Sequence, residues 1–261
     1  MELLHFDKYQ GTGNDFILVD DRKQHRDFNG KTIVKLCDRR FGIGSDGLLL
    51  LRERQGYDFE MLFFNPDGSR ATFCGNGARC ISAFAASLGV IQDEASFLAP
   101  DGAHKASVLS RNGNDSLVSI SMIDPVIYHH SEDYTYLNSG TYHVVKFVPD
   151  PDAVEIMKAG PEIRYDGRFA PAGTNVNFAR INQDSVYVRT YEKGVEAETL
   201  SCGTGVTATA IAASLRTGRT DVRVVTKGGE LRVHFSRKDN NFEGVFLEGP
   251  AVKVFSGSIN L

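Results

Sequence analysis

Cys74-Gly75-Asn76-Gly77 returns as Cys202-Gly203-Thr204-Gly205, 128 residues further along the chain. The flanking sequence repeats as well, because Gly11-Thr12 is matched by Gly140-Thr141 at an offset of 129 residues. Two more segments of the first copy have counterparts at nearly the same spacing: Gly44-Ser45-Asp46 with Gly173-Thr174-Asn175, and Ala85-Ala86-Ser87-Leu88 with Ala212-Ala213-Ser214-Leu215. Offsets this constant over most of a half-chain indicate two copies of one structural unit, each presenting a cysteine at the same point.

The repeat determines the expected fold. We predict an α+β fold of two pseudo-symmetric domains, residues 1–124 and 125–261, each a mixed β-sheet or barrel wrapped around a central buried helix. The central helices are predicted at 78–88 and 206–215, where alanine-rich sequence follows each Cys-Gly motif and small side chains allow close packing on all sides. A last strand within residues 251–261 is expected to pack on the first domain.

Short β runs separated by Gly, Asn and Asp turns make up most of the remaining chain. Two shorter helices, 32–38 and 151–159, are expected at matching places in the two halves. Gly89 and Gly218 stand where left-handed caps of the central helices belong. The predicted strands are 16–20, 59–64, 97–99, 106–109, 117–122, 143–148, 185–191, 222–226, 230–235, 245–248 and 251–255.

The composition is ordinary for a globular protein: 261 residues, 41% hydrophobic, 24% charged and a net charge of −4. With no basic run to oppose that charge, we expect no nucleic-acid partner. The N-terminal residues lack the pattern of an export signal, and no stretch approaches the roughly 18–20 apolar residues of a membrane span. We therefore expect a cytoplasmic protein with reduced thiols. Cys-x-x-Cys pairs and zinc-finger histidine spacing are absent, which predicts no metal site.

Each motif cysteine ends a loop and directly precedes a predicted helix. The positive end of a helix favours thiolate over thiol, and the unpaired N–H groups of the following glycines offer a pocket for an anion. A carboxylate held there would bring its α-carbon within reach of sulfur, and the same N–H groups would stabilise the charge that develops when the α-hydrogen leaves. Two such thiols on opposite faces of one carbon, one ionised and one protonated, would invert a stereocentre without a cofactor.

A single cysteine before a helix is most often a small buried hydrophobic residue, but duplication within a duplicated loop favours catalysis. Cys37 and Cys80 have no counterpart in the second half and are predicted to be packing residues. Among the histidines, His143 is singled out because the repeat places it opposite Asn14. It is a candidate neighbour of the thiols.

At four places the chain resembles the diaminopimelate epimerase family, and the likeness runs from the first predicted strand to the last. The segments that resemble it are Gly11-Thr12-Gly13-Asn14-Asp15-Phe16, Asn65-x-Asp67-Gly68, Cys74-Gly75-Asn76-Gly77-Ala78-Arg79-Cys80 and Glu198-Thr199-x-x-Cys202-Gly203-Thr204-Gly205. The resemblance implies epimerisation of LL-2,6-diaminopimelate to the meso form, on the route to lysine and peptidoglycan. It also implies two catalytic cysteines, no pyridoxal phosphate or metal, and a homodimer.

Residue by residue, the resemblance assigns Cys74 and Cys202 as the acid and base pair. His143 and Glu192 match positions that modulate the pKa of the thiols, and Glu192 can also receive the substrate ammonium. The substrate-binding positions that it implies are Asn14, Asn65, Gly75, Asn76, Asn175, Glu192, Lys193, Gly203 and Thr204. Amide side chains suit a zwitterion, since each offers a donor and an acceptor without net charge, although Asn65-Pro66-Asp67-Gly68 is also a good turn sequence.

Three departures from the family pattern affect distal recognition or loop shape. Lys193 stands where arginine is usual, which replaces a bidentate grip on a carboxylate by a point charge. Thr141-Tyr142-His143 replaces Asn-Pro-His, and one extra residue lies within 194–199. Two alternatives therefore stay open, a racemase of another amino acid on the same fold and a dithiol redox protein.

Overall fold

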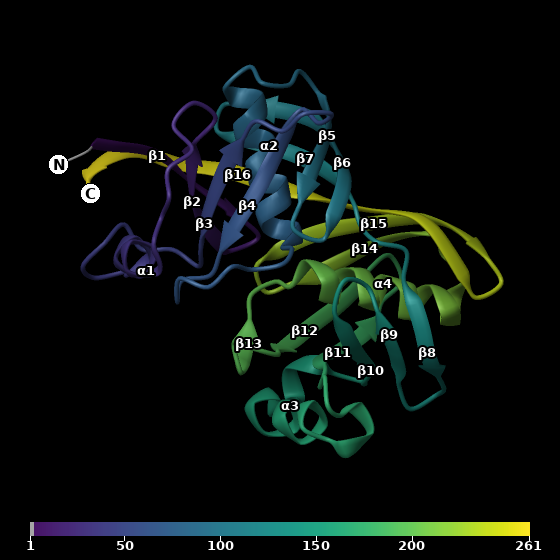
Figure 1. Ribbon diagram of the computed structural model, residues 1–261. Helices are drawn as coiled ribbons and strands as arrows, with labels where there is room; N and C mark the ends of the chain where they lie inside the picture. Colours follow the sequence, from purple (N-terminus) through teal and green to yellow (C-terminus); the bar gives the residue numbers. More distant parts are fainter. Residues whose placement is uncertain (1–2) are drawn as a thin grey trace. The chain divides into compact units, whose positions relative to one another are not determined.

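The computed structural model describes residues 3–261, and its contacts divide the chain into two compact units. Unit 1 comprises the chain up to Ile120 together with Gly249–Leu261, and unit 2 comprises Ser121–Glu248. Each unit consists of strands around a buried helix (Figure 1), and the predicted α+β architecture is therefore confirmed.

The strands of unit 1 form a closed barrel. Their order is β1-β2-β3-β4-β5-β6-β7-β16, and β16 pairs back onto β1 in antiparallel register from Leu3↔Asn260 to Gln10↔Val252. The second part of β16 belongs to this unit. The bounds are β1 Leu3–Gly11, β2 Asn14–Asp20, β3 Leu48–Arg52, β4 Phe59–Phe64, β5 Glu94–Ala99, β6 Gly102–Asn112, β7 Asp115–Ser121 and β16 Asn241–Asn260.

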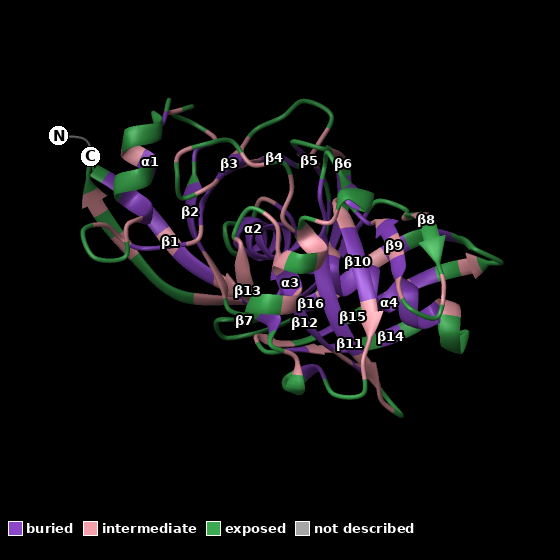
Figure 2. Cartoon of the chain, turned by 90° about the horizontal axis from the view of Figure 1, so that it is seen from below, coloured by how far each residue is buried: buried purple, intermediate pink, exposed green. Residues whose placement is uncertain are grey.

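Helix α2, Gly75–Ser87, passes through this barrel and contacts strands on several sides. Each of its residues from Gly75 to Ala86 is buried (Figure 2). Its alanines and glycines allow strands to approach closely. The chain leaves the helix at Gly89, whose φ of +69° lies in the left-handed region that glycine adopts without strain. Helix α1, Gly30–Cys37, packs its Ile33 and Leu36 against the other face of β1, β2 and β3.

Unit 2 repeats this plan. Its strand order is β15-β14-β12-β11-β10-β9-β8, with the first part of β16 beside β15 and β13 beside β12. Helix α4, Gly203–Thr217, contacts β9, β10, β11, β12, β14 and β15. It ends at the predicted Gly218, a left-handed cap with φ of 77°. The strand bounds are β8 Val126–His130, β9 Thr135–Asn138, β10 Tyr142–Phe147, β11 Asn175–Ile181, β12 Val186–Glu192, β13 Ala197–Thr199, β14 Asp221–Thr226 and β15 Gly229–Lys238.

The helix predicted at 151–159 is wrong in its bounds. The chain first forms a 3-10 turn, η1 Pro151–Ala153, in which Asp150 accepts a hydrogen bond from the N–H of Asp152. Helix α3, Ile156–Arg164, follows and packs Ile156 against β11 and β12. Another 3-10 turn, η2 Gly167–Phe169, comes before β11. The two strands predicted at 245–248 and 251–255 are one strand, β16.

Among residues 3–261, no helix is both long enough and apolar enough to span a membrane.

Candidate functional site

Both motif cysteines occupy the N-cap position of a buried central helix. Cys74 caps α2 with φ of −137° and ψ of 116°, and Cys202 caps α4 with φ of −118° and ψ of 113°. Cys74 is half-buried and Cys202 is 8% exposed. Each sulfur therefore lies at the N-terminal end of a helix, where negative charge is favoured.

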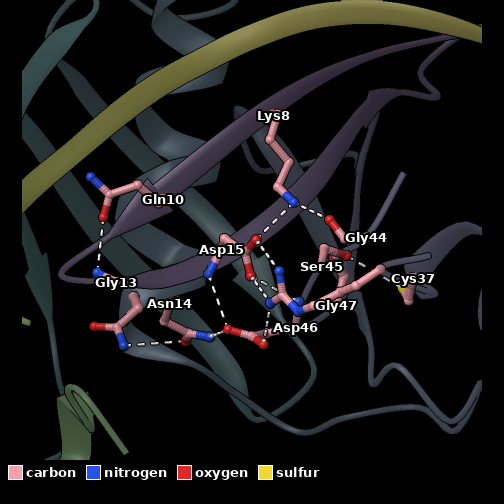
Figure 3. Close-up of polar contacts among 12 residues, drawn as sticks. Lys8, Gln10, Gly13, Asn14, Asp15, Cys37, Gly44, Ser45, Asp46 and Gly47 are labelled. Carbon is pink, nitrogen blue, oxygen red and sulfur yellow. Dashed lines mark hydrogen bonds and ion pairs between the residues drawn. The ribbon is translucent and has the colours of Figure 1, made fainter. Parts of the chain in front are cut away.

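In unit 1, an asparagine amide faces the thiol. Asn14 Oδ1 lies 3.6 Å from Cys74 Sγ and accepts a hydrogen bond from Asn76 Nδ2 at 3.2 Å. The N–H of Gly77 donates to Cys74 Sγ at 3.5 Å. Asn14 Nδ2 donates to Asp46 Oδ2 at 2.8 Å (Figure 3). Since a carboxylate only accepts, this bond fixes the amide of Asn14 with its oxygen toward the sulfur.

Asp46 belongs to a charged network behind Asn14 (Figure 3). Asp15 forms ion pairs with Lys8 at 2.8 Å and with Arg39 at 2.6 Å. Arg39 forms a further ion pair with Asp46 at 2.8 Å. Burial alone would raise the pKa of Asp15, but the hydrogen bonds from Arg39 and Lys8 outweigh it and lower that pKa to about 2. The sequence offered a signal for Asp46, because it is the repeat counterpart of Asn175.

Arg79 lies within the first motif and is completely buried on α2. It donates to Asn76 Oδ1 at 3.0 Å, to the carbonyl of Gly75 at 3.3 Å and to the carbonyl of Pro250 at 3.2 Å. Burial lowers the pKa of Arg79 to about 10, so the guanidinium stays charged at neutral pH. It thereby holds the Asn76 side chain and links the first turn of α2 to β16.

In unit 2, the corresponding place beside the thiol is taken by hydroxyl groups and a histidine. Thr204 Oγ1 lies 3.4 Å from Cys202 Sγ and 2.9 Å from His143 Nε2. Thr141 Oγ1 lies 2.9 Å from the same His143 nitrogen and 3.3 Å from Thr204 Oγ1. The structure thus places His143 one hydroxyl away from Cys202. Burial, with a smaller effect of the Lys193 charge, lowers the pKa of His143 to about 3, and its ring is neutral at physiological pH.

Asn175 and Lys193 lie next to this cluster. Asn175 Nδ2 donates to Thr141 Oγ1 and to the Tyr142 carbonyl, both at 3.0 Å, and its Oδ1 accepts from the backbone N–H of Lys193 at 2.8 Å. The ammonium of Lys193 donates to the Ala172 carbonyl at 3.1 Å.

Glu192 and Asn65, two of the predicted substrate-binding residues, lie at the end of a strand and in a turn, respectively. Glu192 is the last residue of β12, is partly exposed and pairs with Ala197 of β13. Asn65 hydrogen-bonds within its own turn, through Ser69 Oγ at 3.0 Å and the N–H of Gly68 at 3.0 Å. The turn interpretation of this sequence therefore describes its contacts in the structure.

Cys37 and Cys80 are both buried. Burial raises the pKa of the Cys80 thiol to about 12, and burial likewise raises that of Cys37. The part of the chain that the structure describes contains no group of three or more His, Cys, Asp or Glu side chains that could hold a metal ion.

Two α+β repeats, each built around a central buried helix, define a fold with known members. A phenazine biosynthesis protein of the PhzF family from Bacillus anthracis has this fold, with a TM-score of 0.73 and 12% identity over 100% of both chains. A hydroxyproline epimerase from Agrobacterium vitis also has it, with a TM-score of 0.73 and 13% identity over 99% of this chain and 93% of that chain.

Sequence comparisons identify the family to which the chain belongs within this fold. The profile of the family described as diaminopimelate epimerase matches residues 6–128 and 135–254. The diaminopimelate epimerase of Flavobacterium psychrophilum is 45% identical over 258 residues, which cover 97% of this chain and 98% of that protein. The chain belongs to the diaminopimelate epimerase family, and the resemblance read from its motifs is confirmed.

Proposed function

We propose that this protein epimerises LL-2,6-diaminopimelate to the meso form, a step toward lysine and peptidoglycan precursors. In this proposal Cys74 and Cys202 act on opposite faces of one α-carbon. One removes the α-hydrogen as thiolate and the other delivers a hydrogen as thiol. The observation that supports it most directly is the matching N-cap position of both thiols on buried helices.

The chemistry needs stabilisation of the carbanion more than it needs thiolate. Removing the α-hydrogen pushes charge onto the substrate carboxylate, and the N–H groups that follow each cysteine can receive that carboxylate. Losing one such donor typically costs about 3–4 kcal/mol of barrier. A positioned acid or base contributes roughly 10²–10⁴-fold. The side chains of Asn14, Asn76 and Asn175 are proposed to hold the zwitterion, with Glu192 receiving its ammonium.

Exchange of the α-hydrogen in D₂O tests the reaction. Incubation of LL-diaminopimelate with the protein, followed by NMR of the α-position, should show inversion coupled to deuterium incorporation. Cys74→Ser and Cys202→Ser should each slow inversion by at least about 100-fold. Cys80→Ala is the control, because Cys80 is a packing residue of the same helix as Cys74. A rate unchanged in either serine variant would exclude the two-thiol mechanism.

A racemase of another amino acid is a second candidate, and it is favoured by Lys193. Its single ammonium, which contacts the Ala172 carbonyl, provides one point charge where a bidentate arginine would fix a distal carboxylate more firmly. Turnover should be compared between LL-diaminopimelate and a panel of free amino acids. Inactivity toward the former with activity toward one of the latter would replace the proposed substrate and retain the thiol chemistry.

A dithiol redox protein and an epimerase are expected to respond in opposite ways to oxidation of the two cysteines. For an epimerase, a Cys74–Cys202 disulfide is an inactive form that reductant restores. Activity that requires cycling of this disulfide would contradict the proposal. The cytoplasmic location and the homodimer expected from the sequence stay predictions.

A further inference from the structure

We infer that Asn177 is a positioning residue for Cys202, because it fixes the tautomer of His143 and thereby directs the hydroxyl hydrogen of Thr204 toward the sulfur. This inference deepens the proposed function, on which it rests for the role of Cys202 as a reacting thiol. Asn177 belongs to none of the sequence motifs, and it is completely buried on β11.

Two hydrogen bonds fix the orientation of the Asn177 amide. Its Nδ2 lies 3.0 Å from the carbonyl oxygen of Val144, which can only accept. Its Oδ1 accepts from the hydroxyl of Thr190 at 2.9 Å. The amide nitrogen must therefore face Val144, and its second N–H is directed at His143 Nδ1, 3.1 Å away.

The orientation of Asn177 decides where His143 carries its proton. A ring nitrogen that accepts a hydrogen bond has no hydrogen of its own, so Nδ1 is unprotonated. The neutral ring then bears its single N–H at Nε2. This N–H lies 2.9 Å from both Thr204 Oγ1 and Thr141 Oγ1, and it donates to this pair of hydroxyls.

The hydroxyl groups of Thr141 and Thr204 connect His143 Nε2 to the sulfur of Cys202 by hydrogen bonds. Thr141 Oγ1 accepts from Asn175 Nδ2 at 3.0 Å, which leaves its own hydrogen available for Thr204 Oγ1 at 3.3 Å. Thr204 Oγ1 therefore accepts hydrogen bonds from His143 and Thr141. Its own hydrogen is then available for Cys202 Sγ, 3.4 Å away. A donor directed at sulfur stabilises the thiolate.

The other tautomer of His143 would reverse the effect. With the proton on Nδ1, the bare Nε2 would accept the Thr204 hydrogen and withdraw it from Cys202. The N–H of Asn177 excludes that tautomer, since two donors would face each other. The amide of Asn177 is not in contact with Cys202, yet it thereby determines whether the sulfur faces a hydrogen-bond donor or an acceptor.

Unit 1 has a different arrangement, which provides an internal control. There Asn14 presents an oxygen acceptor to Cys74 Sγ, and Asp46 holds the Asn14 amide in that orientation. The inference therefore predicts that a change at Asn177 alters the reactivity of Cys202 and leaves that of Cys74 unchanged.

The first measurement needs no variant. Nitrogen NMR of protein labelled with ¹⁵N-histidine should show His143 as the neutral tautomer protonated at Nε2. In Asn177→Leu, which removes the donor, both tautomers should be populated. Asn182→Leu is the matched control, because Asn182 directly follows the far end of β11 and contacts Arg180 and Ser185. A wild-type His143 protonated at Nδ1 or at both nitrogens would overturn the inference without any substitution.

The second measurement is the alkylation rate of each cysteine by iodoacetamide at pH 7, resolved by peptide mass spectrometry. We expect Asn177→Leu to slow Cys202 by about three- to ten-fold, because loss of a hydrogen bond to a thiolate lowers its population while its intrinsic nucleophilicity partly recovers. Cys74 should react as in the wild type. Thr204→Val should slow Cys202 similarly, Thr204→Ser should restore it, and the Asn177→Leu/Thr204→Val pair should slow it no further.

These outcomes separate the inference from the proposed function. Equal slowing of both cysteines, or a wild-type alkylation rate of Cys202 in Asn177→Leu, would overturn the inference while epimerisation could still be observed. Failure to turn over diaminopimelate, with the expected tautomer and alkylation rates, would reject the proposed function and leave the positioning role of Asn177 in place.

Discussion

The two halves offer a paired test at the third residue after each motif cysteine, where Gly77 and Gly205 are repeat counterparts. A Cβ at Gly77 would lie 3.4 Å from Leu49 Cδ1 and 3.4 Å from Met61 Cε, which are ordinary contacts with the ends of flexible apolar side chains. A Cβ at Gly205 would lie 2.7 Å from Asn177 Oδ1, closer than real contacts allow. The same substitution to alanine should therefore have opposite effects.

The expected magnitudes follow from these contacts. Replacing glycine by alanine within a helix stabilises by up to about 1 kcal/mol, and Gly77→Ala has no steric cost to offset this gain. At Gly205 the overpacking cost of about 1–3 kcal/mol applies, because Asn177 is held by Val144 and Thr190 and cannot move away cheaply. We expect Gly77→Ala to be more stable than Gly205→Ala by about 1–3 kcal/mol.

Urea unfolding followed by circular dichroism measures this difference, with the slope m checked for constancy between variants. Activity supplies a second readout, since displacement of Asn177 and His143 by Gly205→Ala should lower kcat, whereas Gly77→Ala should retain it. If Gly205→Ala proved as stable and as active as Gly77→Ala, the packing of His143 and Asn177 beneath the second motif would be incorrect.

Three further predictions concern buried polar groups and the thiols. Thr209→Val should stabilise the protein by about 1–2 kcal/mol in urea unfolding, because the hydroxyl of Thr209 is completely buried and has no hydrogen-bond partner within residues 3–261; a loss of stability would contradict this. The lowered pKa of His143, about 3 against the usual 6.5, means that only the unfolded chain binds its proton between these pH values. Stability should therefore fall as pH falls through this window, by at most about 1.4 kcal/mol per pH unit from this residue, and urea unfolding of His143→Gln should show a shallower fall than wild type. Finally, kcat/KM for diaminopimelate should be bell-shaped in pH, because one of Cys74 and Cys202 must be ionised and the other protonated; a profile with a single limb would argue against paired thiols.

Local sequence predicted those parts of the fold that local chemistry determines. The central helices were correct in place, although each begins three residues earlier than predicted, at Gly75 and Gly203. The strand at 59–64 and the left-handed Gly218 were correct as well, because alternation and glycine caps act over a few residues. Strand β3, Leu48–Arg52, was missed because its run of leucines lacks the alternation of a half-buried strand. In the structure Leu48 and Leu50 pack toward α1 while Leu49 lies near α2, so both faces of the strand are buried.

Repeat symmetry could locate equivalent positions in the two halves, but it could not reveal where the halves differ chemically. His143 was found through its counterpart Asn14, and Asn175 through the family resemblance. Asn177 was not, because its counterpart is Leu48, and only the parallel pairing of β10 with β11 brings it beside His143. A polar residue in one copy that faces an apolar residue in the other is itself a signal, since a buried amide costs free energy unless it is satisfied. Such breaks in the repeat give the two thiols different hydrogen-bonding partners, an amide oxygen at Cys74 and a hydroxyl group at Cys202, and so allow their pKa values to differ.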